Sequence, residues 1–290
     1  MRGHVYRIIM NILKRLSTLL PDKVIINYLY RSRYGKKPDL KNPKTFNEKI
    51  QWLKLYNRDP LYTSMADKYE ARKYVSEKVG EKHVVPLLGV WDSFDEIDFD
   101  ALPDKFVLKC NHDSGSFVIC TDKNKLDKKS AKTRLETALK RNYYTPYREW
   151  AYKNINKKII AEKHIGYVDI DYRLFMFDGE LRFIECFLDG VTNRRVNLYL
   201  PDWTYLHVQH EYPIDPDNQV TPPHNFDEMI ELAKALSKDI PFLRVDLWNI
   251  DGHVYLNELT FYPNSGVGVF TPGEWDEKIG SWLTLPNKRR

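Results

Sequence analysis

Cysteine is scarce in this sequence of 290 residues, which contains only Cys110, Cys120 and Cys186. Three thiols cannot form an even disulfide framework, and their spacing is not that of a zinc site. We therefore expect reduced cysteines in a cytosolic protein. Long apolar runs are also missing. Because a membrane-spanning helix needs about 18 or more consecutive apolar residues, the sequence predicts no such helix.

Charge of one sign is not in large excess either. The 45 Lys and Arg residues face 40 Asp and Glu residues, so the formal net charge is only +5. Because the basic residues are interspersed with acids, this excess gives no support for nucleic acid as a partner. Weak attraction of phosphates or of anionic lipid agrees equally well with the charge.

The first 20 residues combine a helical apolar pattern with positive charge. Lys14 and Arg15 interrupt the apolar residues and no small-residue cleavage site follows, so a signal peptide is not predicted. Two interpretations remain open, a helix packed on the rest of the protein and a basic helix resting on a membrane surface. We expect a cytoplasmic protein, either free or touching the inner face of the membrane through residues 1–20. The pattern consists of Val5, Ile8, Ile9, Ile12, Leu13, Leu16, Leu19 and Leu20.

Hairpins and a few helices follow a helical region that we expect over residues 1–64. In that region, Thr45 and Glu48 form a capping-box pattern at the start of a helix. No internal repeat and no regular strand–helix alternation is present, which favours an α+β protein with antiparallel sheets. Strands are predicted over 83–90, 105–108, 117–121, 158–165, 172–177, 181–188, 242–249 and 253–261, and helices over 66–80, 127–141 and 226–238.

One predicted strand ends on a cation and opens into a polar loop. Lys109 follows the apolar residues 106–108, and the loop Asn111–Ser116 has no aliphatic side chain. Backbone amides in such a loop can bind phosphate, glycine permits close approach, and the lysine adds charge. The loop is not a P-loop, because that signature is absent and a strand follows instead of a helix. An ordinary polar hairpin is the alternative.

Two carboxylates near the C-terminus form a candidate Mg²⁺ site. Asp246 and Glu258 lie on adjacent predicted strands, and carboxylate oxygens suit this hard cation. A two-residue turn at Asp251-Gly252 would place the two carboxylates on opposite faces of the sheet. We therefore expect a three-residue turn over 250–252, which makes them diagonal neighbours on one face. A hairpin with solvated acids is the alternative.

The order of these motifs resembles the TupA-like ATP-grasp family, which is associated with teichuronopeptide and capsular polysaccharide synthesis. The resemblance runs from about residue 42 to residue 286. It implies two α+β lobes with antiparallel sheets that grip a nucleotide, a first lobe over 65–165 and a second over 166–290. It rests on the phrases NPKTFNEKIQWLKLY, LPDKFVLKCNHDSGS and LNELTFYPNSG, and on Asp67-Lys68, Val107-Leu108-Lys109, Ile159–Ile165, Asp171-Tyr172-Arg173, Arg244-Val245-Asp246 and Asn257–Thr260.

The resemblance also implies roles for individual residues. Lys68 and Lys109 are expected to contact the phosphates of ATP, and the loop 111–116 to close over them. The segment 162–165 is expected to bind the edge of the adenine. Arg173, and Arg194 or Arg195, are expected to face the phosphate that is transferred. The family's third Mg²⁺ ligand is an asparagine two residues after the glutamate, a position that Thr260 occupies here, so either Thr260 or Asn264 is expected to replace it. The implied nucleotide-binding residues are Lys68, Lys109, Asn111, Asp113, Ser114, Gly115, Ser116, Glu162, Lys163, His164, Ile165 and Asp171. The implied catalytic residues are Lys109, Arg173, Arg194 and Arg195, and the implied metal ligands are Asp246, Glu258, Thr260 and Asn264.

The activity that the resemblance implies is ATP-dependent ligation of a carboxylate to an amine. A carboxylate attacks the γ-phosphate, and an amine then takes the acyl group, so ATP and Mg²⁺ are the expected cofactors. The expected acid is a uronic acid or acidic peptide of an envelope polysaccharide, carried on a nucleotide or lipid, and the expected amine is an amino acid or similar compound. The alternatives are a glycosyltransferase for the same polysaccharides, which would use Asp169-Ile170-Asp171 as its metal motif, and a non-catalytic assembly factor.

Overall fold

The computed structural model describes residues 19–188 and 194–287 of the chain. The apolar pattern expected over residues 5–20 therefore lies outside the described residues, except for its last two members. Within the described ranges, none of the helices has the length and apolar character that a membrane crossing requires.

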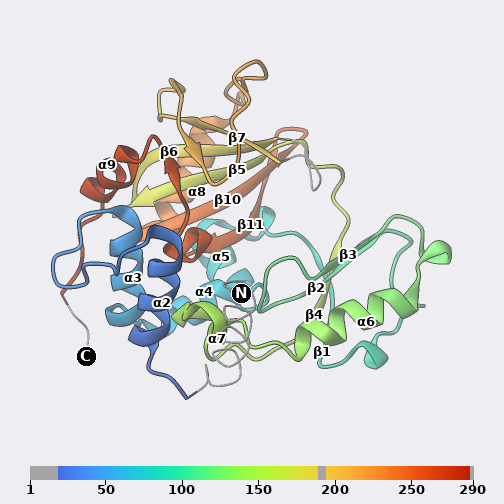
Figure 1. Cartoon of the computed structure of the whole chain (residues 1–290). Helices are drawn as coiled ribbons and strands as arrows, with labels where there is room; N and C mark the ends of the chain where they lie inside the picture. The colour runs from blue at the N-terminus through green and yellow to red at the C-terminus, as the bar shows by residue number, and fades with distance from the viewer. Residues whose placement is uncertain (1–18, 189–193, 288–290) are drawn as a thin grey trace.

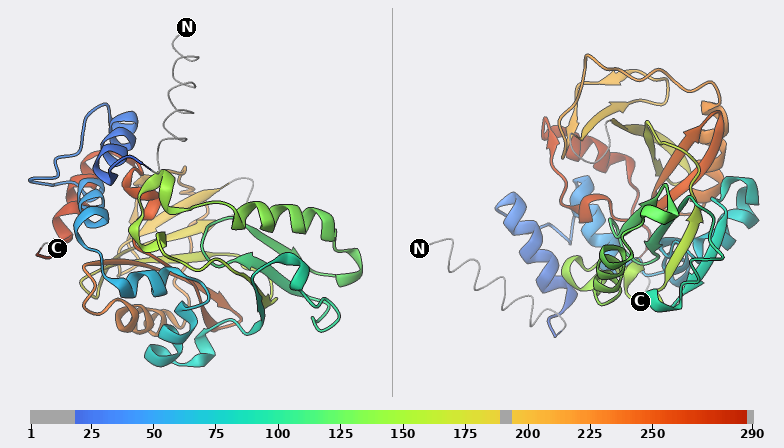
Figure 2. Two further views of the ribbon diagram at one scale, coloured as in Figure 1. Left: turned by 90° about the horizontal axis from the view of Figure 1, so that it is seen from below. Right: turned by 90° about the vertical axis from the view of Figure 1, so that its right-hand side faces the viewer.

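A four-stranded antiparallel sheet forms one side of the molecule. Its strands lie in the order β1 (Leu87–Trp91), β4 (Ile159–Lys163), β2 (Phe106–Cys110) and β3 (Phe117–Cys120). Helix α6 (Lys128–Leu139) covers one face of this sheet with three buried residues at helical spacing, Ala131, Leu135 and Ala138. Figures 1 and 2 show this sheet and α6 projecting to one side, away from the helices near the two chain ends.

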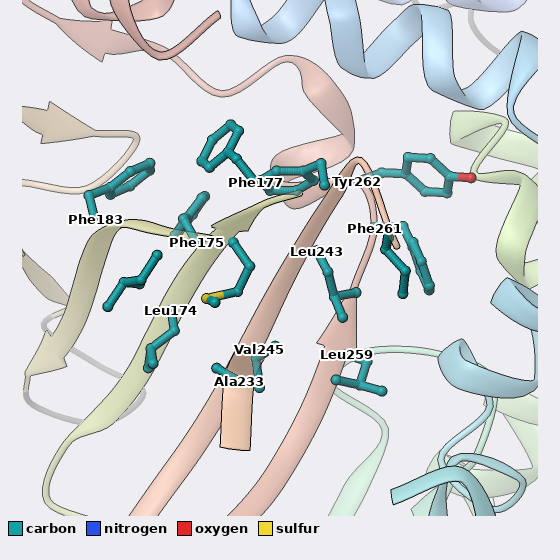
Figure 3. Packing of buried hydrophobic residues seen from close by; sticks show 14 of the residues in the cluster. Leu174, Phe175, Phe177, Phe183, Ala233, Leu243, Val245, Leu259, Phe261 and Tyr262 are labelled. Atoms are coloured by element: carbon teal, nitrogen blue, oxygen red, sulfur yellow. The ribbon is translucent and has the colours of Figure 1, made fainter. Parts of the chain in front are cut away.

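A six-stranded antiparallel sheet forms the larger part of the fold. Its order is β11 (His253–Thr260), β10 (Phe242–Ile250), β5 (Asp171–Phe177), β6 (Glu180–Leu188), β7 (Arg195–Tyr199) and β8 (Tyr205–Leu206). A separate pair joins β9 (Gln209–His210) to β12 (Phe270–Thr271). Helix α8 (Phe226–Ser237) packs against the large sheet, where Ala233 lies near Leu174 and Val245 (Figure 3).

The other face of the large sheet is covered by aromatic packing from both ends of the chain. Phe46 on α3 (Phe46–Tyr56) packs against Phe177 and Phe242, and Trp282 on α9 (Glu274–Trp282) packs against Phe177. The remaining helices are α2 (Asp22–Tyr34), α4 (Pro60–Ala66), α5 (Ala71–Val79) and α7 (Tyr144–Tyr147). Short 3₁₀ turns occur at Glu81–His83, Phe94–Glu96, Lys123–Lys125, Trp150–Tyr152 and Pro263–Gly266.

Most elements agree with the sequence-based predictions, and the α+β class is confirmed. The capping box is present: the Thr45 hydroxyl accepts from the Glu48 N–H, and Glu48 accepts from the Thr45 N–H. The helix expected over 66–80 is interrupted, because Asp67 accepts hydrogen bonds from the backbone of residues 69 and 70 before α5 begins. The short strands β7, β8, β9 and β12 were not predicted.

The hydrophobic core does not follow the predicted lobe ranges closely. Val75 on α5 belongs to the core of the large sheet, although it lies within the predicted first lobe, 65–165. Phe46 on α3 belongs to that core as well, so the helices of residues 19–64 are not a separate layer. The boundaries at 64/65 and 165/166 therefore stay predictions.

Candidate active site

A cavity of about 680 Å³ lies between the two sheets. The small sheet contributes residues of β2, β3 and β4, and the large sheet contributes residues of β5, β10 and β11. Thirteen predicted site residues line it: Lys68, Lys109, Asp113, Ser114, Gly115, Ser116, Glu162, Lys163, His164, Ile165, Arg173, Asp246 and Glu258. Sequence reasoning missed an apolar part of the lining, which includes Val85, Val107, Phe117, Ile119, Tyr167 and Trp248.

Alternation along β2 explains why an apolar strand ends on a cation. Phe106 and Leu108 point into the core beneath α6, so Val107 and Lys109 point the other way, into the cavity. Phe117 and Ile119 on neighbouring β3 are 36% and 55% exposed. The side chains of β2 and β3 therefore make a mostly apolar surface, with Lys109 at the end of β2.

Two cations share the Glu162 carboxylate on this wall. Lys109 Nζ lies 2.6 Å from one oxygen of Glu162, and Arg72 Nη1 lies 3.2 Å from the other. Since one carboxylate cannot neutralise two cations, this group retains a net positive charge beside the cavity. The side chain of Lys109 is only 14% exposed, so a bound anion would interact with it in a poorly hydrated environment.

Lys68 connects the two sheets across the cavity. It follows Asp67 in the turn between α4 and α5, where the Asp67 carboxylate also accepts from Asn111 Nδ2. Lys68 Nζ donates to the Asp113 carbonyl oxygen at 2.6 Å and lies 3.7 Å from the Glu258 carboxylate. The lysine therefore touches both the polar loop and the strand that carries the predicted metal ligand.

Only the tip of the polar loop is exposed. Asn111 is fully buried and fixed by bonds with Asp67 and with the backbone of residues 156 and 158. Ser116 donates to Asp113 within the loop. Ser114 and Gly115 are exposed, and Gly115 has a φ of +89°. The closing motion expected for residues 111–116 stays a prediction. Because the other loop residues are buried, we expect the largest movement at Ser114 and Gly115.

The expected three-residue turn in the β10–β11 hairpin is wrong. Ile250 pairs with His253, so the turn has two residues, and Asp251 and Gly252 both have positive φ. A β-bulge then shifts the register, because Leu247 pairs with Leu256 whereas Asp246 pairs with Glu258. The extra residue, Asn257, turns Glu258 to the side of Asp246. The two carboxylates thus lie directly opposite each other, and both line the cavity.

Two arginines, the buried Arg244 and the half-buried Arg173, lie beside these two acids. Arg244 holds both oxygens of Asp246 at 2.7 and 2.6 Å and lies 3.1 Å from the Thr260 hydroxyl. Arg173 lies 3.8 Å from Asp246, and its guanidinium is 3.4 Å above the centre of the Phe187 ring. Arg244 was missed, although the Arg-x-Asp spacing on one strand places both side chains on the same face.

The pKa values of the two carboxyl groups are shifted in opposite directions. Burial raises the pKa of the Asp246 carboxyl to about 7, although Arg244 and Arg173 lower it. Burial also raises the pKa of Glu258, but Lys68, Arg244 and Arg173 outweigh this effect and hold it below its ordinary value. Glu258 is therefore the carboxylate that is ionised at neutral pH whether or not a cation is bound.

Six predicted site residues do not line the cavity. Asn111 and Thr260 make the bonds described above. Asp171 accepts from Arg173 Nε at 2.8 Å. The remaining three are Asn264, whose amide lies 3.1 Å from His210 Nε2, Arg194, which donates to the Tyr212 hydroxyl at 3.0 Å, and Arg195, which begins β7.

The carboxylates of the cavity fit a divalent cation that is also coordinated by oxygen atoms of a bound molecule. Across the described ranges, no group of three His, Cys, Asp or Glu side chains is arranged to hold a metal. Asp246 and Glu258 alone face each other, so other oxygen atoms must complete the coordination. Mg²⁺ is commonly bound in this way, through one or two carboxylates and the phosphates of a nucleotide.

Comparisons with solved structures give weak overall likenesses to ligases. D-alanine–D-alanine ligase from Bacillus anthracis, in complex with ATP, is 18% identical with a TM-score of 0.41, and the match covers 68% of this chain and 53% of that one. The Helicobacter pylori enzyme of the same name is 17% identical (TM-score 0.40; 77% and 61% covered). L-amino acid ligase from Bacillus licheniformis is 14% identical (0.41; 70% and 44%). The chain thus matches only about half the length of the first of these proteins.

The sequence comparisons are decisive for the family. No curated protein sequence shows significant similarity to the chain. A family model, described as TupA-like ATPgrasp, matches residues 48–284. This range contains both sheets and the cavity between them, and it is most of the chain. The protein therefore belongs to the TupA-like ATP-grasp family.

Proposed function

We propose that this protein is an ATP-dependent carboxylate–amine ligase. The main observation behind this proposal is that three cations and two carboxylates line one cavity. The cations are Lys68, Lys109 and Arg173, and the carboxylates, Asp246 and Glu258, lie opposite each other. A carboxylate oxygen of the substrate attacks the γ-phosphorus and ADP leaves. The nitrogen of an amine then attacks the acyl carbon of the acylphosphate, and phosphate leaves. No nucleophilic side chain is needed, because positioning and charge neutralisation provide most of the catalysis in phosphoryl transfer.

The two kinds of lining in the cavity suit the two ends of ATP. The apolar side chains of Val107, Phe117 and Ile119 offer a surface for the adenine, next to the segment 162–165. Lys109 and Lys68 lie deeper, where the phosphates would be placed. A pocket that is mostly apolar and has a few convergent charged groups is the usual form of such a site.

Mg²⁺ would be held by Glu258 and Asp246 together with phosphate oxygens, and it would supply charge neutralisation there. Glu258 is ready for this role, because its carboxyl is ionised at neutral pH. Asp246 already accepts two bonds from Arg244, which fixes the direction of its carboxylate. Thr260 or Asn264 as a third ligand stays a prediction.

The substrates are proposed from the family association. The acid would be a uronic acid or acidic peptide of an envelope polysaccharide, and the amine would be an amino acid or a similar compound. A location in the cytoplasm or at the inner membrane face agrees with such a role. The alternative glycosyltransferase is less well supported, because Asp171 of the Asp-x-Asp motif is bonded to Arg173 and does not line the cavity.

Thermal unfolding with candidate nucleotides tests this proposal. ATP with Mg²⁺ is expected to stabilise the protein, by roughly 2.7 kcal/mol at one hundred times the dissociation constant. UDP-sugars with the same metal are expected to leave the melting temperature unchanged. Stabilisation by UDP-sugars alone would instead favour the glycosyltransferase.

Replacing Gly115 by valine tests the loop tip as a cover for the transferred phosphate. Because the backbone at Gly115 has φ +89°, a β-branched residue is strained there, although a Cβ would meet no atom within 4 Å. We expect the variant to bind ATP but to release more phosphate per amide formed, since water reaches the acylphosphate. In the wild type, amide hydrogen exchange at residues 114–116 should slow when an ATP analogue and Mg²⁺ are added.

The control for this variant is Gly273→Val. Gly273 also has open space around its Cβ position, but its φ is −64° and it lies at the start of α9. If hydrogen exchange at residues 114–116 is the same with and without the analogue, while residues 162–165 become protected, the loop does not act as a cover.

A further inference from the structure

A second hollow lies on the opposite side of the polar loop from the nucleotide cavity. Its volume is about 730 Å³, and it is lined by the loop tip, residues 114–116, and by α6 and the residue that follows it closely, Arg141. The same three loop residues line the nucleotide cavity. A ligand in this groove would therefore contact the same loop tip that borders the nucleotide cavity.

Helical spacing builds one wall of the groove. Ala131, Leu135 and Ala138 point into the core, so the stripe Ser130, Arg134 and Thr137 lies on the outer side, at positions i, i+4 and i+7, and Arg141 lies just beyond the helix end. Thr133 and Lys129 also line the groove. Lys129, Arg134 and Arg141 thus place three cations along this wall of the groove.

The charge of this segment is strongly one-sided. Residues 128–141 contain six Lys and Arg residues and a single acid, Glu136, whose carboxylate accepts the Phe94 N–H at 2.9 Å. Among the described residues, Lys129 and Arg141 form no salt bridge. By contrast, Lys132 on the same helix is paired with Asp95 at 2.5 Å and does not line the groove.

Arg134 joins the groove to the loop. Its Nη2 donates to the Gly115 carbonyl oxygen at 3.0 Å, and its guanidinium lies 5.4 Å from the centre of the Phe117 ring. Gly115 and Phe117 both line the nucleotide cavity. An anion bound by Arg134 would therefore rest against the residues that hold the loop tip in place.

We propose that this groove binds an acidic polysaccharide, which carries the carboxylate that the enzyme activates. The proposal rests on the ligase function above and adds a binding site to it. Cations spread along one wall suit carboxylates that repeat along a chain. The Thr137 hydroxyl can exchange hydrogen bonds with sugar hydroxyls, and the Ser130 and Thr133 hydroxyls, which donate to Asp127 and to the Lys129 carbonyl oxygen, can accept them. None of the nine lining residues has an aromatic or purely aliphatic side chain, so the groove offers no pocket for peptide side chains and no platform for nucleic-acid bases.

Calorimetric titration of the full-length protein with oligogalacturonate tests the groove. We expect binding that weakens as salt is added, and no binding of neutral dextran. The double variant Lys129→Gln with Arg141→Gln should bind about tenfold to a hundredfold more weakly, because it loses charge-assisted contacts. Lys132→Gln removes one charge from the same helix outside the groove and should bind as the wild type does.

Three results would overturn this assignment. They are absence of binding to the wild type, equal binding by the double variant, and binding of poly-L-glutamate or single-stranded RNA at least as tight as that of oligogalacturonate. Thermal stabilisation by ATP and Mg²⁺ is measured on the same samples. If the double variant keeps it, the lost affinity belongs to the groove and not to misfolding. If the wild type lacks it, the ligase proposal fails, and the titration still decides whether the groove binds glycan.

Discussion

Replacing Glu258 by glutamine is expected to lower kcat about 10²- to 10³-fold, the range typical for the loss of one group that stabilises transition-state charge. Neighbouring cations hold the pKa of Glu258 below its ordinary value, and its carboxylate lies 3.7 Å from Lys68. Glutamine keeps the shape of the side chain but weakens the proposed hold on Mg²⁺ and leaves Lys68 without its carboxylate. Steady-state release of ADP, measured over a range of Mg²⁺ concentrations, gives the size of the loss.

The matched control is Glu180→Gln, which removes an exposed carboxylate at the start of β6 on the same sheet. Its kcat should equal that of the wild type. Thermal unfolding of both variants separates a loss of catalysis from a loss of folded protein. If the Glu258→Gln enzyme has the wild-type kcat and an unchanged dependence on Mg²⁺, Glu258 is not a ligand of the metal.

The Lys109→Ala variant should bind ATP about tenfold to a hundredfold more weakly. Loss of a charge-assisted contact to phosphate corresponds to about 1.5–3 kcal/mol. The remaining Glu162 carboxylate, held then by Arg72 alone, adds negative charge beside the phosphates. Calorimetric titration with a non-hydrolysable ATP analogue and Mg²⁺ measures the change.

Two further variants make this result specific. Lys109→Arg keeps the charge and should recover part of the affinity. Lys105→Ala removes an exposed lysine in the turn before β2 and should have no effect on ATP binding. If Lys109→Ala binds the analogue as tightly as the wild type, the lysine has only a structural role with Glu162.

Local pattern was enough to predict most of the elements but not the details of the site. Apolar runs predicted the strands that carry Lys109, Glu162, Arg173 and Asp246, because these strands are buried on at least one face. The bulge at Asn257 was not predicted, since the choice between two registers depends on which face the surrounding structure buries. The strand β7 was missed because it has only five residues.

The role of a residue could be predicted where it depends on the alternation of side chains along a strand. It could not be predicted where it depends on contacts with residues that are distant in sequence. Lys109 lines the cavity because alternation demands it. Asn111 belonged to the same polar loop, yet it is buried and bonds Asp67, a residue far away in sequence. The roles of Arg244 and Asn264 also depend on their neighbours in the folded protein. Arg244 reaches Asp246, and Asn264 reaches His210.

The packing of α3 against the C-terminal part of the chain has a consequence for synthesis on the ribosome. The Asn47 N–H donates to the Asp276 carboxylate at 3.0 Å, and Phe46 packs against Phe242. At about 5–20 residues per second, the partners of α3 are made roughly 10–50 s after α3 itself. During that interval Phe46 lacks its contact with Phe242, although Phe177 is made earlier. The nascent chain therefore leaves part of the apolar face of α3 uncovered until residues 242–276 have been made, and the large sheet cannot be completed before β10 and β11 are synthesised.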